Sequence, residues 1–376
     1  MAVRQRVEGL SPEGRESPQP QQPPGAPGPG PGQSVPAELS SGKIDMRYIA
    51  PAASVVVVVR PSQLLASPIA QVFPVEVASA AGLKYLGFDS KEIEEVVSFV
   101  DLSNPIAPAY GTTFKFKNPI RASSIPAEMR AHAQLADLGG KKYLRSAVPT
   151  MYSLYGPNNK TLVAATDAAL HQMVENATRP KLGPLTDRLR EVPAGSDLYF
   201  AADLASLRPF IQMGLAQAEA MGKAPPEAKQ NLEKLNLVAA IELTLNVSAP
   251  GPTSLVIHCT DDAAAQKVES GIQEFLQKLR ESKPTEQPAG DDPIAQAMER
   301  YKDRILQLFQ PQRNGNSVTC LHLDGQNPAQ QQFAAVVIIG AVEAAILPAV
   351  KAKWAAATRA QAAPGPGGSP EAGQRR

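Results

Sequence analysis

The sequence predicts an α+β fold in which one unit of strands and helices occurs twice, followed by a hydrophobic C-terminal helix. Two observations predict the repeat: strand-like segments recur at a constant offset of about 142 positions, and amphipathic segments follow them at matching places. A long apolar run near the C-terminus predicts the last helix. We therefore divide the chain into a disordered Pro/Gly-rich tail (1–43), a first repeat (44–167), a connector (168–193), a second repeat (194–325), a C-terminal hydrophobic helix (329–362) and a second disordered tail (363–376).

The two tails hold many of the 36 prolines and 27 glycines of this 376-residue chain. Residues 11–36, SPEGRESPQPQQPPGAPGPGPGQSVP, contain too few apolar side chains for burial to offset the entropy lost on ordering. We expect this segment to be disordered or polyproline-like, and the same composition predicts the same for 363–376.

Matched strand segments define the repeat. They are SVVVVVR (54–60) with DLYFAAD (197–203), EEVVSFVDL (94–102) with NLVAAIEL (236–243), and TTFKFK (112–117) with SLVIHC (254–259). The first strand of each unit is followed by the start of a helix. A Pro-rich turn, SNPIAPAYG or NVSAPGPT, separates the second and third strands, so we expect them to pair antiparallel. TLVAAT (161–166) and SVTCLHL (317–323) close the two units.

Helical segments lie between the third strands and the closing strands. They are RASSIPAEMRAHAQL (121–135) in the first unit, and 262–282 followed by 293–309 in the second. Apolar residues recur at helical spacing in both segments of the second unit. In 262–282 they are Val268, Ile272, Phe275, Leu276 and Leu279, and in 293–309 they are Ile294, Met298, Tyr301, Ile305, Leu308 and Phe309. We interpret both stripes as core. The predicted unit is βαββαβ-like, an antiparallel sheet with helices on one face, and the pattern leaves open whether the two sheets merge.

The apolar run FAAVVIIGAVEAAILPAV (333–350) is the candidate membrane or partner helix. Its strongly apolar residues contribute about −4 kcal/mol to insertion, and Glu343, with Gly340 and Pro348, brings the sum near zero. The candidate contact residues are Phe333, Val336, Val337, Ile338, Ile339, Val342, Glu343, Ile346, Leu347, Pro348 and Val350.

This balance leaves two alternatives for the run: it enters a membrane or a partner protein, or it packs on the chain's own core. Lys351, Lys353 and Arg359 follow it, so a spanning helix is expected to have its C-terminus inside and the body outside. No secretory signal is visible in the sequence as written, so either its start omits one or the body is not exported.

The segment IIGAVEAAILPAVKAKW resembles the hydrophobic helix of type IV pilins and pseudopilins, in which an Ile-Ile-Gly run leads to a Leu-Pro-Ala step. Prepilins have Gly before the mature Phe and Glu at its fifth position. Here Gln332 precedes Phe333 and Val337 is at the fifth position, so we expect no cleavage by a prepilin peptidase.

Three further segments, DMRYIAPAASVVVVVRP, SLYGPNNKTLVAATD and DDPIAQAMERY, resemble a group of bacterial proteins of unknown function, common in planctomycetes. In that group an α+β region precedes a pilin-like hydrophobic helix. The resemblance implies the same arrangement in this chain. Many members continue into a further domain, whereas this sequence stops at Arg376, which puts an assembly role for the helix in doubt.

Catalytic and cofactor motifs are not found in the sequence. A net charge of +1 gives no field to attract an acidic polymer, so nucleic acid is not an expected partner. His258, Cys259, Asp261 and Asp262 with Cys320, His322 and Asp324 have residue types that suit zinc, but neighbouring strand residues point to opposite faces. We predict no metal and no cofactor, and we interpret Cys259 and Cys320 as buried thiols, with a disulfide possible in an exported protein if their strands are neighbours.

Paired carboxylates such as Glu94 with Glu95 and Asp291 with Asp292 are interpreted as solvated strand or helix starts. The sequence thus predicts a non-enzymatic, membrane-associated protein of the cell envelope, whose C-terminal helix contacts a membrane or another envelope protein. The alternative is a soluble cytoplasmic binding module with the helix packed on its own core. The ligand is not predicted.

Overall fold

Strand β1 (Val55–Val59) consists of five valines and lies at the centre of the fold. β-branched side chains suit a strand that is covered on both faces. β1 pairs antiparallel with β2 (Ile93–Asp101) on one side and with β8 (Leu198–Asp203) on the other. Because β2 belongs to the first predicted repeat and β8 to the second, this strand joins the two halves into one sheet.

The structure is a computed structural model that describes residues 44–71, 75–85, 87–104, 108–125, 127–148, 152–193, 195–222, 228–248, 250–281 and 293–338. All of these residues belong to one compact unit, Glu38–Arg376. The predicted tails 1–43 and 363–376, and residues 339–362 of the predicted C-terminal helix, lie outside the described residues.

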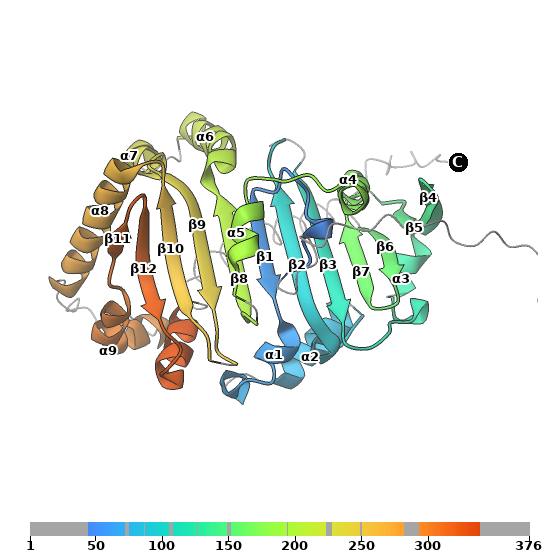
Figure 1. The fold of residues 1–376 in the computed structure, drawn as a ribbon, viewed down its shortest axis with the longest axis horizontal. Helices are drawn as coiled ribbons and strands as arrows, with labels where there is room; N and C mark the ends of the chain where they lie inside the picture. The colour runs from blue at the N-terminus through green and yellow to red at the C-terminus, as the bar shows by residue number, and fades with distance from the viewer. Residues whose placement is uncertain are drawn as a thin grey trace, which may run out of the picture. The chain divides into compact units, whose positions relative to one another are not determined.

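The sheet is antiparallel throughout and has the strand order β11-β12-β10-β9-β8-β1-β2-β3-β7-β6-β5-β4 (Figure 1). The remaining strands are β3 (Ala109–Phe116), β4 (Ala133–Leu138), β5 (Lys141–Ser146), β6 (Ser153–Asn158), β7 (Thr161–Ala165), β9 (Val238–Leu245), β10 (Thr253–Cys259), β11 (Gln312–Asn314) and β12 (Ser317–Leu323). Outward from the β1–β8 pair, β2, β3, β7 and β6 follow on one side, and β9, β10, β12 and β11 follow on the other. Strands that the sequence matched therefore lie at equal distances from the centre.

The helices are α1 (Pro61–Leu64), α2 (Val75–Tyr85), α3 (Ala127–Ala131), α4 (Asp167–Thr178), α5 (Thr186–Glu191), α6 (Leu204–Ala220), α7 (Ala228–Leu235), α8 (Asp262–Glu281) and α9 (Pro293–Leu308). Short 3₁₀ turns lie at Met46–Tyr48, Pro68–Gln71, Ser90–Glu92 and Ala122–Ser124. After β12, a further helix runs from residue 328 and is described to residue 338; we call it the terminal helix.

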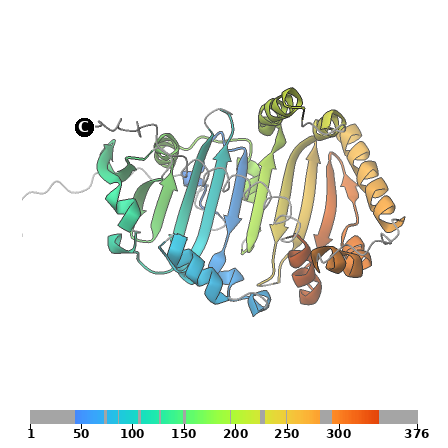
Figure 2. The ribbon, with the colours of Figure 1, turned by 180° about the vertical axis from the view of Figure 1, so that it is seen from behind.

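Helices cover both faces of the sheet, so the prediction of helices on one face was wrong. Val163 and Ala165 of β7 share a core cluster with α4, whereas Leu162 and Ala164 pack on the other face with Phe88. α4 and α5 lie on the near side in Figure 1, and α2 lies on the near side in Figure 2. The cause is visible in β7, which is buried at every position and so presents an apolar surface on both sides.

The helix predicted over 121–135 was also wrong. Only Ala122–Ser124 and Ala127–Ala131 are helical, and Ala133–Leu138 is strand β4, which pairs with β5. A two-residue turn, Gly139–Gly140, joins them, with φ of 58° and 85°. A type I′ hairpin turn, whose twist matches that of the strands, requires positive φ at both central positions. The Gly-Gly pair was therefore the hairpin signal that the helical interpretation missed.

The predicted helical stripes are buried only in part. In α8, Val268 and Ile272 pack on the sheet and Leu276 is buried, but Phe275 is 63% exposed. Leu279 is also exposed. In α9, Ile305 and Leu308 are buried and Phe309 packs beside them, whereas Tyr301 is exposed. The side chains of Ile294 and Met298 lie outside the described residues.

Candidate functional site

The terminal helix begins with local signals that favour a helix. Asn327 accepts a hydrogen bond from the Gln330 amide through its Oδ1 atom (3.2 Å), and Pro328 follows it at the first helical position. The Gln331 amide donates to the Asn327 carbonyl (3.1 Å), which closes the first turn.

The first three turns of this helix pack on the body. Ala334 and Ala335 are both 0% exposed. Ala335 packs with Leu245 and Val247, and Ala334 packs with Leu308, Leu321 and Leu323. Alanine at these positions allows the helix backbone to lie close to the sheet. Gln331 is 4% exposed, and its side-chain amide donates to the Gly251 carbonyl (2.5 Å).

Four of the predicted membrane or partner residues are described, and they do not form one surface. Phe333, Val337 and Ile338 are partly buried against the core, while Val336 is 46% exposed. The other candidates, Ile339, Val342, Glu343, Ile346, Leu347, Pro348 and Val350, lie outside the described residues. Within the described ranges, none of the helices combines the length and hydrophobicity needed to cross a bilayer.

A polar cluster around Glu242 brings several ionisable side chains together on the sheet. Oε1 of Glu242 lies 2.5 Å from Nη1 of Arg188 and 2.7 Å from Nε2 of His258, and Oε2 accepts a hydrogen bond from the Tyr199 hydroxyl (3.1 Å). Nδ1 of His258 lies 3.0 Å from Oγ of Ser317. We call these five residues the Glu242 cluster.

Strand register brings the cluster together. Glu242 of β9 lies opposite Val256 of β10, and His258 is two residues further along the same face. His258 in turn lies opposite Ser317 of β12. Arg188 reaches the carboxylate from α5, which is part of the segment predicted as a connector. Side chains from α5, β8 and β10 thus converge on the carboxylate of Glu242, and Ser317 of β12 contacts His258.

Burial and charge have opposite effects on the Glu242 carboxylate. Burial opposes its ionisation, but close contacts with His258 and Arg188 outweigh that effect and lower the pKa of Glu242 to about 2. The contact between His258 Nε2 and Oε1 is short but poorly directed for a hydrogen bond. Burial raises the pKa of the Tyr199 hydroxyl far above its usual range, and the adjacent carboxylate adds to the effect.

Chemically, the cluster resembles an ion-pair network more than a catalytic site. A Ser–His–Glu order is present, but the carboxylate is also held by Arg188 and by the hydroxyl of Tyr199, which is 1% exposed. A catalytic carboxylate that orients an imidazole needs that imidazole free to move a proton at a bound substrate. The geometry therefore supports a fixed, charged surface feature.

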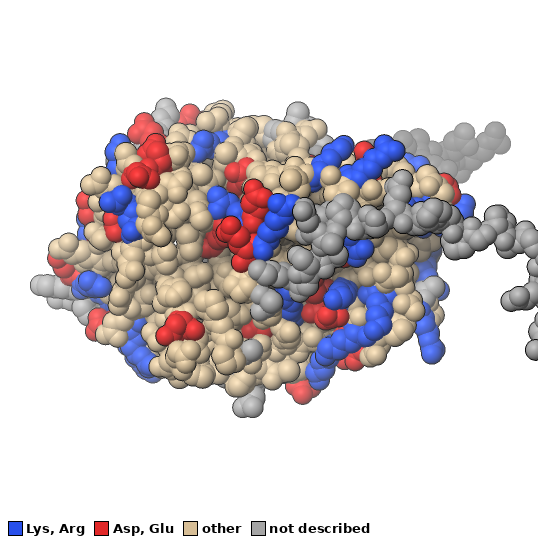
Figure 3. All heavy atoms as spheres, in the orientation of Figure 1, with Lys and Arg blue, Asp and Glu red and all other residues tan. Residues whose placement is uncertain are grey.

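The sheet face around this cluster is not crossed by any described helix. Ser254, Val256 and His258 of β10, with Thr319 opposite Val256, share a face with Glu242. Ala201 of β8 lies opposite Glu242, and Val56 of β1 lies opposite Ala201, so the same face continues into the first half of the sheet. There it is covered by α4 and residues 44–50. We call the part over β9, β10 and β12 the open face. In Figure 1 these strands are drawn with no helix in front of them, and Figure 3 shows acidic and basic side chains gathered at its inner border, beside α5.

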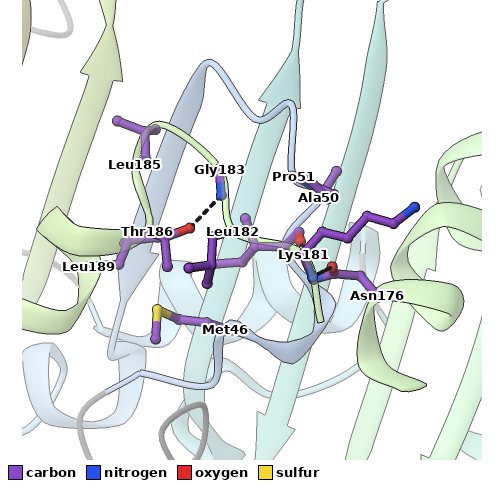
Figure 4. Close-up of a pocket in the computed structure, with 11 residues that line it drawn as sticks. Met46, Ala50, Pro51, Asn176, Lys181, Leu182, Gly183, Leu185, Thr186 and Leu189 are labelled. Atoms are coloured by element: carbon purple, nitrogen blue, oxygen red, sulfur yellow. Dashed lines mark hydrogen bonds between the residues drawn. The ribbon is translucent and has the colours of Figure 1, made fainter. Parts of the chain in front are cut away.

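A small cavity lies between residues 46–51 and the loop 181–189 (Figure 4). Its volume of about 20 Å³ fits roughly one water molecule and is far below that of a small-molecule site. The Gly183 amide donates to Oγ1 of Thr186 (2.7 Å), and the Lys181 amide donates to Oδ1 of Asn176 (2.8 Å). Nδ2 of Asn176 in turn donates to the Ile49 carbonyl (2.9 Å), so the loop is held to the N-terminal segment through Asn176 and the cavity is a packing feature.

The sequence candidates for a metal site separate in the structure. His258 joins the Glu242 cluster, whereas Cys259 and Cys320 are free, buried thiols that share a core cluster under α8. Burial raises the pKa of the Cys320 thiol to about 11. Oδ1 of Asp261 accepts a hydrogen bond from the Ala264 amide (2.7 Å) at the start of α8. Within the described ranges, no three metal-ligating residues gather.

Glu95 departs from the expectation of a solvated strand start. Its carboxylate is 7% exposed and accepts a hydrogen bond from Nη2 of Arg60 (2.9 Å), and Arg60 also donates to the Ser196 carbonyl. Burial raises the pKa of Glu95, with Arg60 acting against the shift. Glu94, the next residue, faces the other side and pairs with Lys115 (2.9 Å) as an exposed ion pair.

Comparisons with known proteins identify no family. No family model matches the chain, and no curated protein matches it. Among solved structures, crystal forms I, III and IV of TP0453 are similar, with TM-scores of 0.37, 0.39 and 0.39 and identities of 9%, 10% and 9%. The matches cover 77%, 78% and 80% of this chain and 96%, 96% and 98% of those chains. TM-scores in this range carry no inference about function.

Proposed function

We propose that this protein is a non-enzymatic binding module whose C-terminal helix begins as part of its own core. The observation that carries the proposal is the complete burial of Ala334 and Ala335 against strand and helix residues of the second half. Fully buried positions in a helix are typical of a core element. A helix that docks in this way holds the body together rather than leaving it for a membrane.

The open face is the proposed binding surface. In the first half, α4 and residues 44–50 pack on the corresponding strands β2, β3 and β7. In the second half, the terminal helix follows β12 and packs with Leu255 and Leu321. These residues lie on the opposite side of the sheet from Glu242. Among the described residues, no helix occupies in the second half the position that α4 occupies in the first. We propose that a helix of a partner protein occupies it.

The chemistry of the open face selects a polar helix. Its partly exposed side chains are short or polar (Ser254, Val256, Ser317 and Thr319), and the Glu242 cluster lies among them. Hydroxyls and the imidazole offer both donors and acceptors to a partner. A partner helix with alternating small and polar residues on one side suits this surface better than an apolar one.

We also infer that the two halves arose by duplication of one βαββαβ-like unit. The equal strand order outward from β1 and β8 supports it, as does the constant spacing of the matched segments. Under this proposal the open face is equivalent to the face of the first half that α4 and residues 44–50 cover.

A helical-peptide library displayed on phage tests the binding surface. We expect selection on the full chain to enrich helical peptides whose binding is lost in Thr319→Arg, since a long cation at the centre of the open face blocks docking. The matched control, Gln277→Arg on the exposed side of α8, is expected to bind as the unmodified chain does. Peptides that bind both variants equally, or no enrichment at all, would contradict the proposal.

Envelope attachment through the apolar run is the second candidate function. It is favoured by the exposure of Val336, which belongs to the apolar run 333–350 that continues beyond the described residues. Flotation with vesicles of phosphatidylethanolamine and phosphatidylglycerol separates the two candidates. We expect the full chain to remain in the bottom fraction. Flotation of the full chain, lost on deletion of 339–376, would instead support the envelope role.

A further inference from the structure

Strand β4 is the end strand of the sheet on the side of the first half (Figure 1). It pairs with β5 along its whole length, from Ala133 opposite Ser146 to Leu138 opposite Lys141. Within the part of the chain that the structure describes, its other edge has no strand beside it. The edge therefore presents backbone donors and acceptors to a partner.

The hydrogen-bonding pattern defines which residues face outward. The Ala147 amide donates to the His132 carbonyl (2.8 Å), so these two form a hydrogen-bonded pair of the antiparallel ladder. Such pairs alternate along the ladder, which directs the backbone groups of Gln134, Ala136 and Leu138 toward β5. Those of Ala133, Leu135 and Asp137 point to the open edge.

An apolar row runs across the sheet to the same edge and ends at Leu135. Leu154 of β6 lies opposite Leu144 of β5, and Leu144 lies opposite Leu135. Leu154 is 5% exposed, whereas Leu135 is 72% exposed, the largest value among the large apolar side chains of the described residues. The row is thus buried at its inner end and uncovered at its outer end.

The opposite end of the sheet is protected, whereas in the described part of the chain no element covers the edge of β4. Strand β11 has three residues, and the Arg313 amide donates to Oε1 of Glu269 on α8 (3.2 Å). Natural sheets protect their edges with short strands, Lys, Pro, bulges or covering elements. β4 has six residues, AQLADL, with no Lys or Pro and an unbroken register.

We propose that β4 pairs antiparallel with β4 of a second copy of this chain, with Leu135 on the two-fold axis. Leu135 then lies opposite the partner's Leu135, and Ala133 lies opposite the partner's Asp137. All three outward residues become hydrogen-bonded pairs, about six backbone hydrogen bonds in total. The apolar row continues into the partner.

This register also places no like charges opposite each other across the interface. Asp137 already pairs with Lys142 (3.1 Å) and meets an alanine across the interface, so no like charges lie opposite each other. A shift by one residue in each copy is the nearest alternative that keeps the outward groups paired. In one direction it sets Leu135 opposite Asp137, and in the other it sets Leu135 opposite Ala133 and leaves Asp137 beyond the end of the partner's strand, with fewer backbone hydrogen bonds. The outward edge is therefore complementary to itself in one preferred register, which favours a second copy as its occupant.

Light scattering coupled to size-exclusion chromatography tests the dimer on the full chain. We expect the unmodified chain to have twice the mass of one copy at micromolar concentration, and Leu135→Lys to have the mass of one copy, since the two-fold axis sets two ammonium groups opposite each other. Leu83→Lys, at another exposed leucine, is the matched control and is expected to remain dimeric. A monomeric unmodified chain, or a dimeric Leu135→Lys, overturns the proposal.

Cross-linking tests the register without disturbing the fold. In a hydrogen-bonded antiparallel pair the two Cα atoms are about 5.5 Å apart, within the range of a disulfide. Leu135→Cys is expected to give a disulfide-linked dimer on oxidation. Asp137→Cys is not, because the two copies of residue 137 lie about 13 Å apart along the strands. Cross-linking at 137 but not at 135 overturns the proposal.

Discussion

The guanidinium of Arg60 donates to the carboxylate of Glu95 at 2.9 Å, and both side chains are more than nine-tenths buried where β1 meets β2. A buried charge pair of this kind adds little net stability, but removing one partner leaves the other charge without compensation.

Substitution Arg60→Met is therefore expected to lower the free energy of unfolding by about 3–5 kcal/mol at neutral pH. The loss should be smaller in mild acid. The pKa of Glu95 is already raised by burial, and without Arg60 it rises further, so protonation removes the uncompensated charge. Urea unfolding of both proteins at the two pH values measures the difference. An equal loss at both would contradict this account.

Glu242→Gln tests the charge of the Glu242 cluster. The folded pKa of Glu242 is about 2, below its ordinary value of 4.5, so the ionised group contributes stability above the ordinary value and loses it as the pH falls toward 2. The shift corresponds to about 3 kcal/mol at most. We expect Glu242→Gln to be less stable than the unmodified chain near neutral pH, with a gap that narrows as the pH falls below about 4.

Thermal unfolding across this pH range measures the difference in stability between Glu242→Gln and the unmodified chain. Glu94→Gln is the matched control, because its carboxylate is an exposed partner of Lys115 on the other face of the sheet. A gap that stays constant with pH would show that the charge of Glu242 does not carry the stabilisation.

Gly183 is expected to tolerate no side chain. A Cβ atom there would lie 2.0 Å from the Pro51 carbonyl oxygen, so Gly183→Ala must displace the loop 181–189 from residues 46–51. We expect a loss of about 1–3 kcal/mol. Gly271→Ala is the matched control: its Cβ meets no atom within 4 Å in the middle of α8, and helix propensity favours alanine by up to about 1 kcal/mol. Denaturant midpoints that move in the same direction for both would refute the packing argument.

The strands of the second half were well predicted from sequence, because side-chain periodicity and the turn residues that end a strand are read from neighbouring positions. SVTCLHL forms β12 over the predicted residues, and 262–282 forms α8 with a difference of one residue. The β2–β3 and β9–β10 pairs are antiparallel, as the Pro-rich turns predicted. The mixed α+β class with a large antiparallel sheet is confirmed.

Long-range relationships were outside the reach of the sequence pattern. Glu242 meets Arg188 and Tyr199 across more than forty positions, and only the order β8-β9-β10 brings them together. Local periodicity carries no information on that order. A polar residue within the apolar strand NLVAAIEL was the available signal, since a carboxylate among apolar neighbours needs a partner. Similarly, the burial of Glu95 follows from Arg60, which the sequence analysis did not single out.

The most direct test of the central claim compares two neighbouring residues of the terminal helix. Ala335 is 0% exposed and Val336 is 46% exposed, so Ala335→Asp sets a carboxylate into the core and Val336→Asp sets it into solvent. Both introduce the same residue into the same helix. We expect Ala335→Asp to lower the free energy of unfolding by about 3 kcal/mol or more, and Val336→Asp to change it far less. Equal melting temperatures for the two variants would mean that the helix is not part of the body.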